Sequence, residues 1–225
     1  GQGKVLCPEN RVRKIEIEVV ILKKKYYAVK EGRIPGIYNS WSECEEQVKG
    51  FSGAVYKSFL TLDEASDFIN GSIKNEVDKD ISQLKDNEMI AYVDGSFNKD
   101  KGYYSYGAIM FTKDEKMTSS SRGNDSELIE MRNVAGEIEG AMAAMNIALK
   151  RNIHILYLHY DYMGIEKWAN GEWKANKVGT KKYAAYYNSI KDKLKVIFIK
   201  VKAHSGNKYN EEVDALAKEA LDGIN

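Results

Sequence analysis

The chain has little cysteine, since only Cys7 and Cys44 occur in its 225 residues and they do not form a CxxC pair. Neither a disulfide framework nor a zinc site is therefore indicated, and we expect both thiols to be reduced and without a role. Long apolar runs are also missing. No run approaches the ~18 residues that a membrane span needs, and residues 19–22 are too few for the core of a signal peptide. We expect a soluble protein of the cytoplasm.

An excess of charge of one sign is absent too. The 34 lysines and arginines nearly balance the 33 aspartates and glutamates, which gives a net charge of +1. No global basic field attracts a polyanion, so nucleic-acid binding would have to come from local patches. Hydrophobic residues make up 43% and charged residues 30% of the chain. This composition supports a folded core rather than disorder.

Four segments follow one another along the chain, whose length fits one large domain or two modest ones. Residues 1–22 form a leader to which we assign no function, although the alternation of Ile15, Ile17, Val19 and Ile21 suits a strand with one buried face. Residues 23–69 are rich in tyrosine and glycine and should form a compact domain. Residues 70–88 are predicted to be a linker, and residues 89–225 a larger domain.

The end of the compact domain carries a helix signal, because Thr61 and Glu64 have the spacing of a capping box. The linker after this helix has few apolar residues, namely Ile73, Val77, Ile81 and Leu84. Their spacing allows a thin helical stripe that packs on a neighbour, and a solvated tether is the alternative.

The larger domain has the pattern of an α/β fold. Three strands around residues 89–97, 104–112 and 116–124 predict an antiparallel meander. A helix is predicted over residues 133–150, and the apolar run of residues 154–161 predicts a strand buried on both faces. Helical segments at 164–169 and 183–193, a strand at 196–204 and a terminal helix complete a mixed sheet with helices on its faces.

Four acids stand out from the other carboxylates. Asp94 and Asp161 follow apolar strands, so they could share a ligand site if those strands are parallel neighbours, although aspartates are also common in turns. Glu137 is predicted in the first turn of the long helix, where a solvated acid is the plainer interpretation. Asp214 lies at the margin of the terminal helix's apolar face, where a surface acid would be ordinary.

Together the four acids indicate metal. Four clustered carboxylates repel one another unless they bind cations, and two magnesium ions would leave the cluster formally neutral. Two such cations suit in-line cleavage of a phosphodiester without a protein nucleophile. The chain agrees with this in having no GxSxG, HExxH, P-loop or dinucleotide-binding motif.

At these acids the sequence resembles type 1 ribonuclease H over about residues 89–221. The matching blocks are YVDGS (92–96), RNVAGEIEGAM (132–142), LYLHYD (156–161) and KAHSGNKYNEEVDALA (202–217), of which the last is the most specific. The resemblance implies a ribonuclease H-like mixed five-stranded sheet flanked by helices. It also implies that two magnesium or manganese ions are bound by the four acids, Asp94, Glu137, Asp161 and Asp214.

The same resemblance assigns roles to three further residues. His204 matches a loop histidine that helps product release or proton handling, and a solvated loop histidine is the alternative. Asn133 matches a position that touches the hybrid, and Asn210 matches a residue near the second metal. Glu139 competes with Glu137, but it lies about 200° further round the helix. No long basic insertion lies between Asp161 and His204, so the basic protrusion of some relatives is missing.

Residues 25–69 resemble the small α+β hybrid-binding domain attached to many type 1 ribonucleases H. The resemblance implies that Trp41 and Tyr56 pack against DNA sugars, that Lys57 meets a phosphate, and that Tyr27 helps to build the same surface. The alternative is that Trp41 and Tyr56 are core residues. A second lysine often follows the first in relatives, but here Ser58 stands after Lys57, so hybrid affinity could be lower.

The expected function is that of a monomeric endoribonuclease that cuts the RNA strand of RNA/DNA hybrids, leaving 5′-phosphate and 3′-hydroxyl ends. Recognition should rest on the 2′-hydroxyl and on groove shape, read near Asn98, Asn133 and the binding domain. Two alternatives remain. One is a non-catalytic protein that binds hybrids or double-stranded RNA on a nuclease-like scaffold, and the other is an integrase- or resolvase-type nuclease that acts on DNA.

Overall fold

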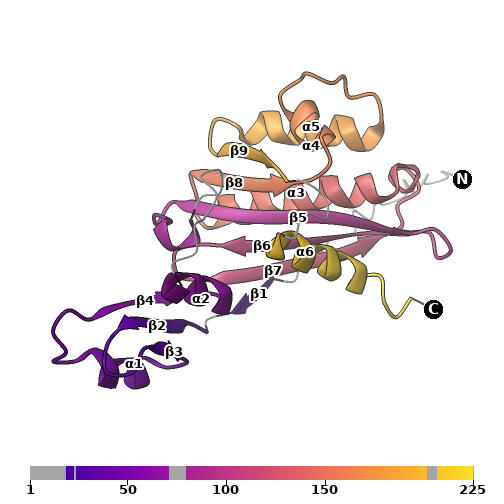
Figure 1. The fold of residues 1–225 in the computed structure, drawn as a ribbon. Helices are drawn as coiled ribbons and strands as arrows, with labels where there is room; N and C mark the ends of the chain where they lie inside the picture. Colours follow the sequence, from indigo (N-terminus) through magenta and orange to yellow (C-terminus); the bar gives the residue numbers. More distant parts are fainter. Residues whose placement is uncertain (1–18, 23, 71–79, 202–206, 225) are drawn as a thin grey trace, which may run out of the picture.

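The computed structural model describes residues 19–22, 24–70, 80–201 and 207–224. They form two sheets, one of three strands and one of six (Figure 1). None of the helices in these residues is long and apolar enough to cross a membrane.

The smaller sheet has the order β3-β2-β4 and is antiparallel throughout. Its strands are β2 (Tyr26–Glu31), β3 (Gly36–Tyr38) and β4 (Val55–Phe59). Helix α1 (Trp41–Val48) packs on one face through Cys44 and Val48, which meet Val29. Helix α2 (Leu62–Asn70) packs on the other face, where Ala65 meets Ala28 and Phe59. The sheet is therefore sandwiched between two short helices.

Both helices begin with a side-chain cap. The capping box predicted at α2 is present in part, since the Thr61 hydroxyl accepts a hydrogen bond from the Glu64 amide at 3.4 Å. Helix α1 was not predicted. It has a complete capping box, in which Ser40 and Glu43 cap each other's backbone amides.

The larger sheet has the order β1-β7-β6-β5-β8-β9. The predicted meander is confirmed as β5 (Glu88–Asn98), β6 (Tyr103–Phe111) and β7 (Lys116–Gly123), and β8 (Ile155–Tyr160) and β9 (Lys195–Lys200) follow in parallel to β5. The expected five strands are thus present. A sixth, β1 (Val19–Leu22), comes from the leader and pairs antiparallel with β7.

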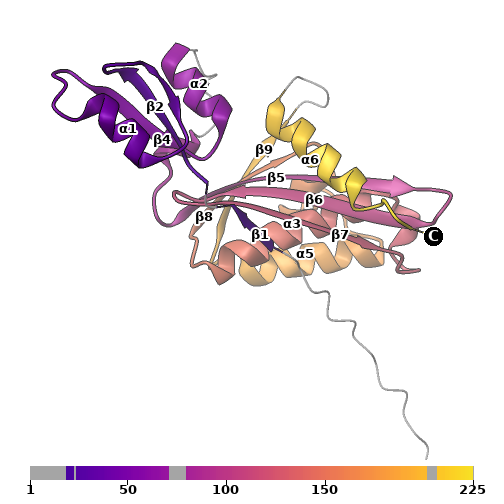
Figure 2. The ribbon, with the colours of Figure 1, turned by 90° about the horizontal axis from the view of Figure 1, so that it is seen from below.

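Helices cover both faces of this sheet (Figure 2). On one face lie α3 (Asn133–Lys150), α4 (Gly164–Ala169) and α5 (Val178–Ile190), and on the other lies α6 (Lys208–Glu219). The bounds of α3 and α4 are as predicted, whereas α5 begins five residues earlier than the predicted segment 183–193 and ends three residues before it. Met89, Ala91 and Val93 of β5 face α3, and Ile90 and Tyr92 face α6. Strand β5 is therefore buried on both faces.

The described end of the linker is packed rather than solvated. Ile81 begins a short 3₁₀-helix, η1 (Ile81–Gln83), and both Ile81 and Leu84 are buried in the cluster that contains Ile90 and Phe111. A second 3₁₀-helix, η2 (Ile129–Met131), precedes α3.

Candidate metal centre and nucleic-acid surface

Asp94 and Asp161 meet because their strands are parallel neighbours. Strand β5 pairs with β8 in parallel, with Tyr92 opposite His159, so Asp94 and Asp161 each lie two residues beyond this pair. Asp94 lies inside β5, which continues into the hairpin, and Asp161 directly follows β8. The sequence predicted a shared ligand site only if the two strands are parallel neighbours, and they are.

Glu137 joins them because α3 lies unusually close to the sheet. A Cβ atom on Gly95 would lie 2.3 Å from the Asn133 carbonyl oxygen, and one on Gly136 would lie 1.8 Å from the Ser105 carbonyl oxygen. Only glycine fits at such distances. One carboxylate oxygen each from Asp94, Glu137 and Asp161 can therefore lie within 4.8 Å of the other two.

The structure corrects the expected position of Glu137. It is the fifth residue of α3, just past the first turn in which it was predicted, and only 1% of it is exposed. The interpretation of Glu137 as a solvated acid at the helix dipole is therefore wrong. Its neighbour Glu139 points elsewhere, to a separate cavity between α3 and α5 that Tyr106 and Lys182 also line.

Asp214 lies beside the three clustered acids. All four acids line one cavity of about 250 Å³ whose lining is completed by Gly95, Asn133, Asn210 and Glu211. Asp214 is partly exposed and pairs with Lys218 of its own helix at 2.7 Å. Glu211 was not predicted as a site residue, although it directly follows Asn210 in the first turn of α6.

Burial and mutual repulsion disfavour negative charge here. Burial raises the pKa of Asp94 to about 6, and the charges of Asp161 and Asp214 act in the same direction. Burial and then the charge of Asp94 raise the pKa of Glu137 well above its usual value. The Oε2 atom of Glu137 is buried and has no hydrogen-bond partner among the residues that the structure describes. A cation bound here would satisfy this oxygen and relieve the repulsion.

His204 lies outside the described residues, so its prediction is untested. The other predicted polar residues are placed. Asn133 opens α3 and Asn210 lies in the first turn of α6, both at the acid cavity. Asn98 lies at the β5–β6 hairpin, where its side chain accepts a hydrogen bond from the Lys101 amide at 3.0 Å.

The three predicted aromatic residues form one surface on the small sheet. The Trp41 ring centroid lies 6.0 Å from that of Tyr27 and 5.9 Å from that of Tyr56. Trp41 and Tyr56 are each 44% exposed, which argues against the alternative that they are core residues. We call Tyr27, Trp41 and Tyr56 the aromatic surface.

Lys57 does not share this surface. Neighbouring side chains of a strand point to opposite faces, and Tyr27 is paired with Ser58 whereas Ala28 is paired with Lys57. Ser58 therefore points to the side of the aromatic surface. Lys57 points to the side of α2, where its ammonium lies 5.7 Å from the centroid of the Phe59 ring.

Two family models match this chain, each over a different part of it. A family model described as Ribonuclease H1 N-terminal domain matches residues 25–69. A second model, described as RNase H, matches residues 86–222, which is more than half of the chain.

Some relatives match over most of their length, and others match only over a short segment. Ribonuclease H1 of Rattus norvegicus is 26% identical over 86% of this chain and 88% of its own length, and ribonuclease H1 of Homo sapiens has the same identity and coverage. Ribonuclease H of Crithidia fasciculata is 58% identical over 48 residues, which are 21% of this chain but only 10% of that protein. The chain likewise covers only 13% of the length of ribonuclease H of Saccharomyces cerevisiae.

Solved structures align with part of the chain. RNase H1 from the halophilic archaeon Halobacterium salinarum has a TM-score of 0.48 and 21% identity over 60% of this chain and 98% of its own. LC11-RNase H1 in complex with an RNA/DNA hybrid has a TM-score of 0.49 and 18% identity over 60% of this chain and 96% of its own. Because the RNase H model spans most of the larger domain, the chain belongs to the ribonuclease H family.

Proposed function

We propose that the chain is a ribonuclease H enzyme, an endoribonuclease that hydrolyses the RNA strand of RNA/DNA hybrids with two divalent cations. The observation that carries this proposal is the cluster of Asp94, Glu137 and Asp161, whose oxygens lie within 4.8 Å of one another beside Asp214. Full-length relatives named ribonuclease H1 support it.

The donor set fits hard cations. All four acids offer carboxylate oxygens, which magnesium prefers, and manganese is an acceptable substitute. Glu137 and Asp94 would be the inner ligands because they are the most buried of the four, with Asp161 and Asp214 nearer to solvent. When bound, such a cation pair supplies an activated water and stabilises the leaving oxygen, so that the RNA would leave with 5′-phosphate and 3′-hydroxyl ends.

The chain's own residues would orient the RNA strand. Asn133 and Asn210 line the same cavity as the acids and present amide groups that can hydrogen-bond a 2′-hydroxyl, the group that marks RNA. His204 would move a proton or help the product to leave. The aromatic surface would hold the DNA strand, since flat rings give contact that tolerates any sequence. Asn98 and Lys57 would add polar and phosphate contacts, and the protein would act as a monomer.

The test is cleavage of a labelled RNA/DNA hybrid in magnesium by the intact chain and by Asp94→Asn. The amide is a poor ligand for a hard cation, so we expect the rate to fall by at least about 10²- to 10³-fold, while hybrid affinity in the absence of metal changes little.

Asp100→Asn is the matched control, because Asp100 is exposed in the turn after β5. Duplex DNA and duplex RNA complete the substrate panel. Near-normal turnover by Asp94→Asn would refute the metal-site assignment. Binding of the hybrid without cleavage by the intact chain would favour the non-catalytic alternative, and cleavage of duplex DNA would favour the integrase-type one.

A further inference from the structure

The N-terminal domain is tied to the larger sheet at its start. Strand β1 pairs with β7 from Val19 opposite Ser119 to Leu22 opposite Lys116, and β2 begins at Tyr26. Only residues 23–25 lie between β1 and β2, and three residues span at most about 10 Å. The small domain therefore stays beside the sheet edge as long as β1 remains paired.

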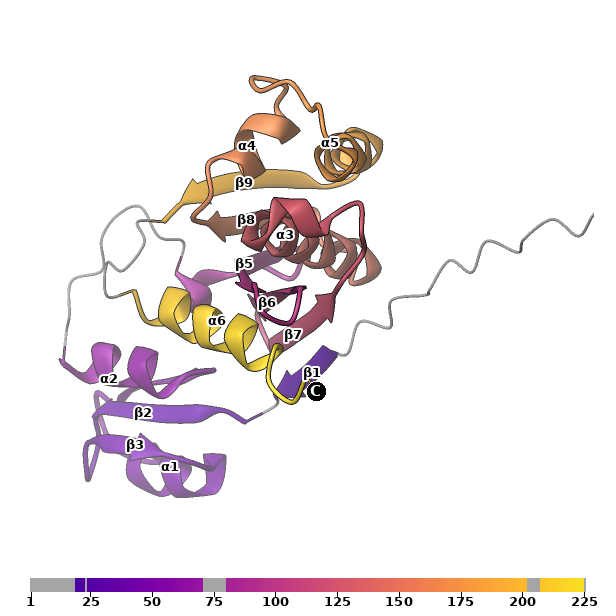
Figure 3. The ribbon, with the colours of Figure 1, turned by 90° about the vertical axis from the view of Figure 1, so that its right-hand side faces the viewer.

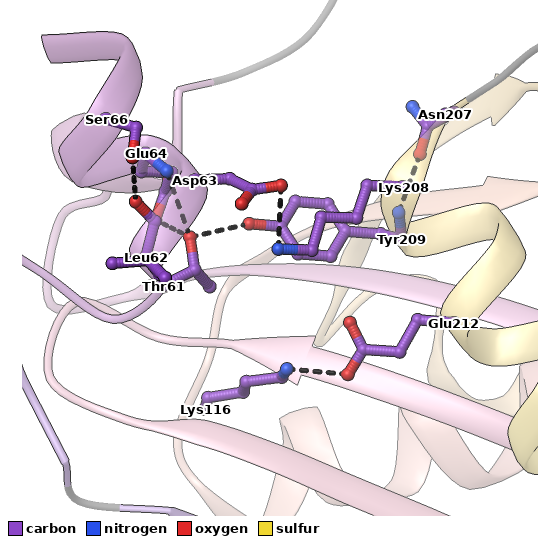
Figure 4. A network of polar contacts seen from close by, with 10 residues as sticks. All are labelled: Thr61, Leu62, Asp63, Glu64, Ser66, Lys116, Asn207, Lys208, Tyr209 and Glu212. Carbon is purple, nitrogen blue, oxygen red and sulfur yellow. Dashed lines mark hydrogen bonds and ion pairs between the residues drawn. The ribbon is translucent and has the colours of Figure 1, made fainter.

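A second attachment joins the start of α2 to the start of α6 (Figures 3 and 4). The Thr61 and Tyr209 hydroxyls are hydrogen-bonded at 3.0 Å. The Lys208 ammonium lies 2.7 Å from the Asp63 carboxylate. We call these four residues the docking contact.

The docking contact rests on apolar packing that belongs to both domains. Tyr209 packs against Phe111, with ring centroids 4.9 Å apart, and against Tyr92 at 5.2 Å. Leu60, the last residue before the cap of α2, is buried in the same cluster, together with Ile81 of the linker. On the β7 side, Lys25 and Asp114 form a further, weaker ion pair at 3.9 Å. Both ends of the small domain are thus held against the larger one.

The helix that receives the small domain also carries part of the acid cavity. Lys208 and Tyr209 immediately precede Asn210, and Asp214 follows one turn later on α6. A fixed small domain therefore has a fixed position relative to the acids.

We propose that the docking contact holds both domains as one body. A hybrid bound on the aromatic surface then presents its RNA strand to the acids at one fixed distance along the duplex from that surface. Thr61, Asp63, Lys208 and Tyr209 are then specificity-determining residues for the position of the cut. This inference rests on the proposed function for its effect on cleavage, but the docking itself is independent of it.

The test uses a duplex in which one strand is DNA and the other carries an RNA tract flanked by DNA. The variant Lys208→Asp with Tyr209→Phe places like charges together and removes the hydrogen bond, at positions outside the acid cavity. The matched control adds Asp63→Lys, which restores an ion pair of reversed polarity. All three proteins cut tracts that are shortened step by step, and the cut positions are mapped from an end label.

We expect the intact chain to cut within a narrow range of distances from the end of the RNA tract. Cleavage should cease sharply when the tract is shorter than a minimum length. The two-substitution variant should at least double the spread of cut positions and lose the sharp limit, and adding Asp63→Lys should narrow the spread again. An unchanged spread in the two-substitution variant would overturn the inference.

Small-angle X-ray scattering without substrate separates this inference from the proposed function. We expect the radius of gyration to increase in the two-substitution variant and to return when Asp63→Lys is added. If the intact chain cuts nothing but the scattering changes as stated, docking stands and the proposed function fails. If the chain cuts hybrids but neither scattering nor cut positions respond, the docking inference fails alone.

Discussion

At the scale of single residues, the acid cavity brings four carboxyl groups together, and two of them, Asp94 and Glu137, are buried. Asp94 is 9% and Glu137 1% exposed. Burial is the largest cause that raises the pKa of each, and repulsion adds to it, from Asp161 at Asp94 and from Asp94 at Glu137. Such groups favour the protonated form unless a cation is bound. The site is therefore unstable as a metal-free anion, and this has a measurable consequence.

In the metal-free protein, the contribution of Asp94 to stability should fall as the pH rises. The pKa of Asp94 is about 6 in the folded chain and close to 3.8 when the chain is unfolded, so between these values the folded state binds more protons. The contribution of Asp94 to the free energy of unfolding then falls from about pH 4 to above pH 6. We expect Asp94→Asn in EDTA to gain stability relative to the intact chain over this range, by on the order of 2 kcal/mol.

Urea unfolding at a series of pH values measures this difference, with Asp100→Asn as the control that should show no such gain. Magnesium should stabilise the intact chain more at neutral than at acid pH, because the ligands must be deprotonated. A stability difference between Asp94→Asn and the intact chain that does not change with pH would contradict the pKa shift.

The nucleic-acid surface gives a second prediction at this scale. Ser58, not Lys57, points to the side of the aromatic surface. Ser58→Lys should therefore add one phosphate contact, tighten hybrid binding and steepen its salt dependence by about one unit of slope. Trp41→Ala should weaken binding without changing that slope. Filter binding at several salt concentrations measures both.

Lys57→Ala provides the comparison for Ser58→Lys. Because Lys57 lies against Phe59 on the α2 side, its removal should change hybrid affinity less than Ser58→Lys does. A larger loss from Lys57→Ala than the gain from Ser58→Lys would show that Lys57 makes the main phosphate contact from the α2 side.

At the scale of elements, the contact between α3 and β5 decides where Glu137 lies. Gly136 is inside a helix, where alanine would ordinarily stabilise by up to about 1 kcal/mol. Its Cβ atom would, however, lie 1.8 Å from the Ser105 carbonyl oxygen. We expect Gly136→Ala to destabilise the protein by about 2 kcal/mol or more, because overpacking outweighs helix propensity.

Thermal unfolding measures this change, and Gly36→Ala is the control, since its Cβ atom would meet only the Tyr38 side chain at 3.8 Å. Gly136→Ala should also weaken magnesium binding, because the helix must shift to relieve the clash. A stabilised Gly136→Ala variant would show that α3 is not held as closely as described.

Strong local periodicity explains what could be predicted at this scale. The apolar spacing of residues 133–150 marked α3 to the residue, and the apolar run before Asp161 marked β8. The spacing of Ser40 and Glu43 also signals a capping box, but α1 was missed because its segment was interpreted only from its tyrosines and glycines. The burial of Glu137 could not be predicted, because it follows from a close contact between α3 and the sheet that Gly95 and Gly136 permit.

At the scale of the whole molecule, the linker was the part that the sequence described least well. Its few apolar residues allowed a solvated tether, yet Ile81 and Leu84 share a buried cluster with Leu60 of the small domain and Ile90 of β5. No local pattern records such long-range packing. The two domains therefore share part of one core.

A shared core predicts that both domains unfold together. Trp41 is the tryptophan of the small domain, and Trp168 and Trp173 belong to the larger one. With both of the latter replaced by phenylalanine, Trp41 fluorescence reports the small domain alone. We expect its urea midpoint to coincide with that of the far-ultraviolet circular dichroism, which follows all helices and strands. An earlier Trp41 midpoint would mean that the small domain unfolds independently.

The pairing of β1 with β7 also bears on how the protein can be divided. A fragment that starts at the linker keeps β5 to β9 but loses β1, so the backbone amides and carbonyls of β7 that face Val19–Leu22 are left open. An uncovered strand of this kind is a template for pairing with another chain. Removing residues 1–69 would thus create an edge prone to self-association, which β1 covers in the intact molecule.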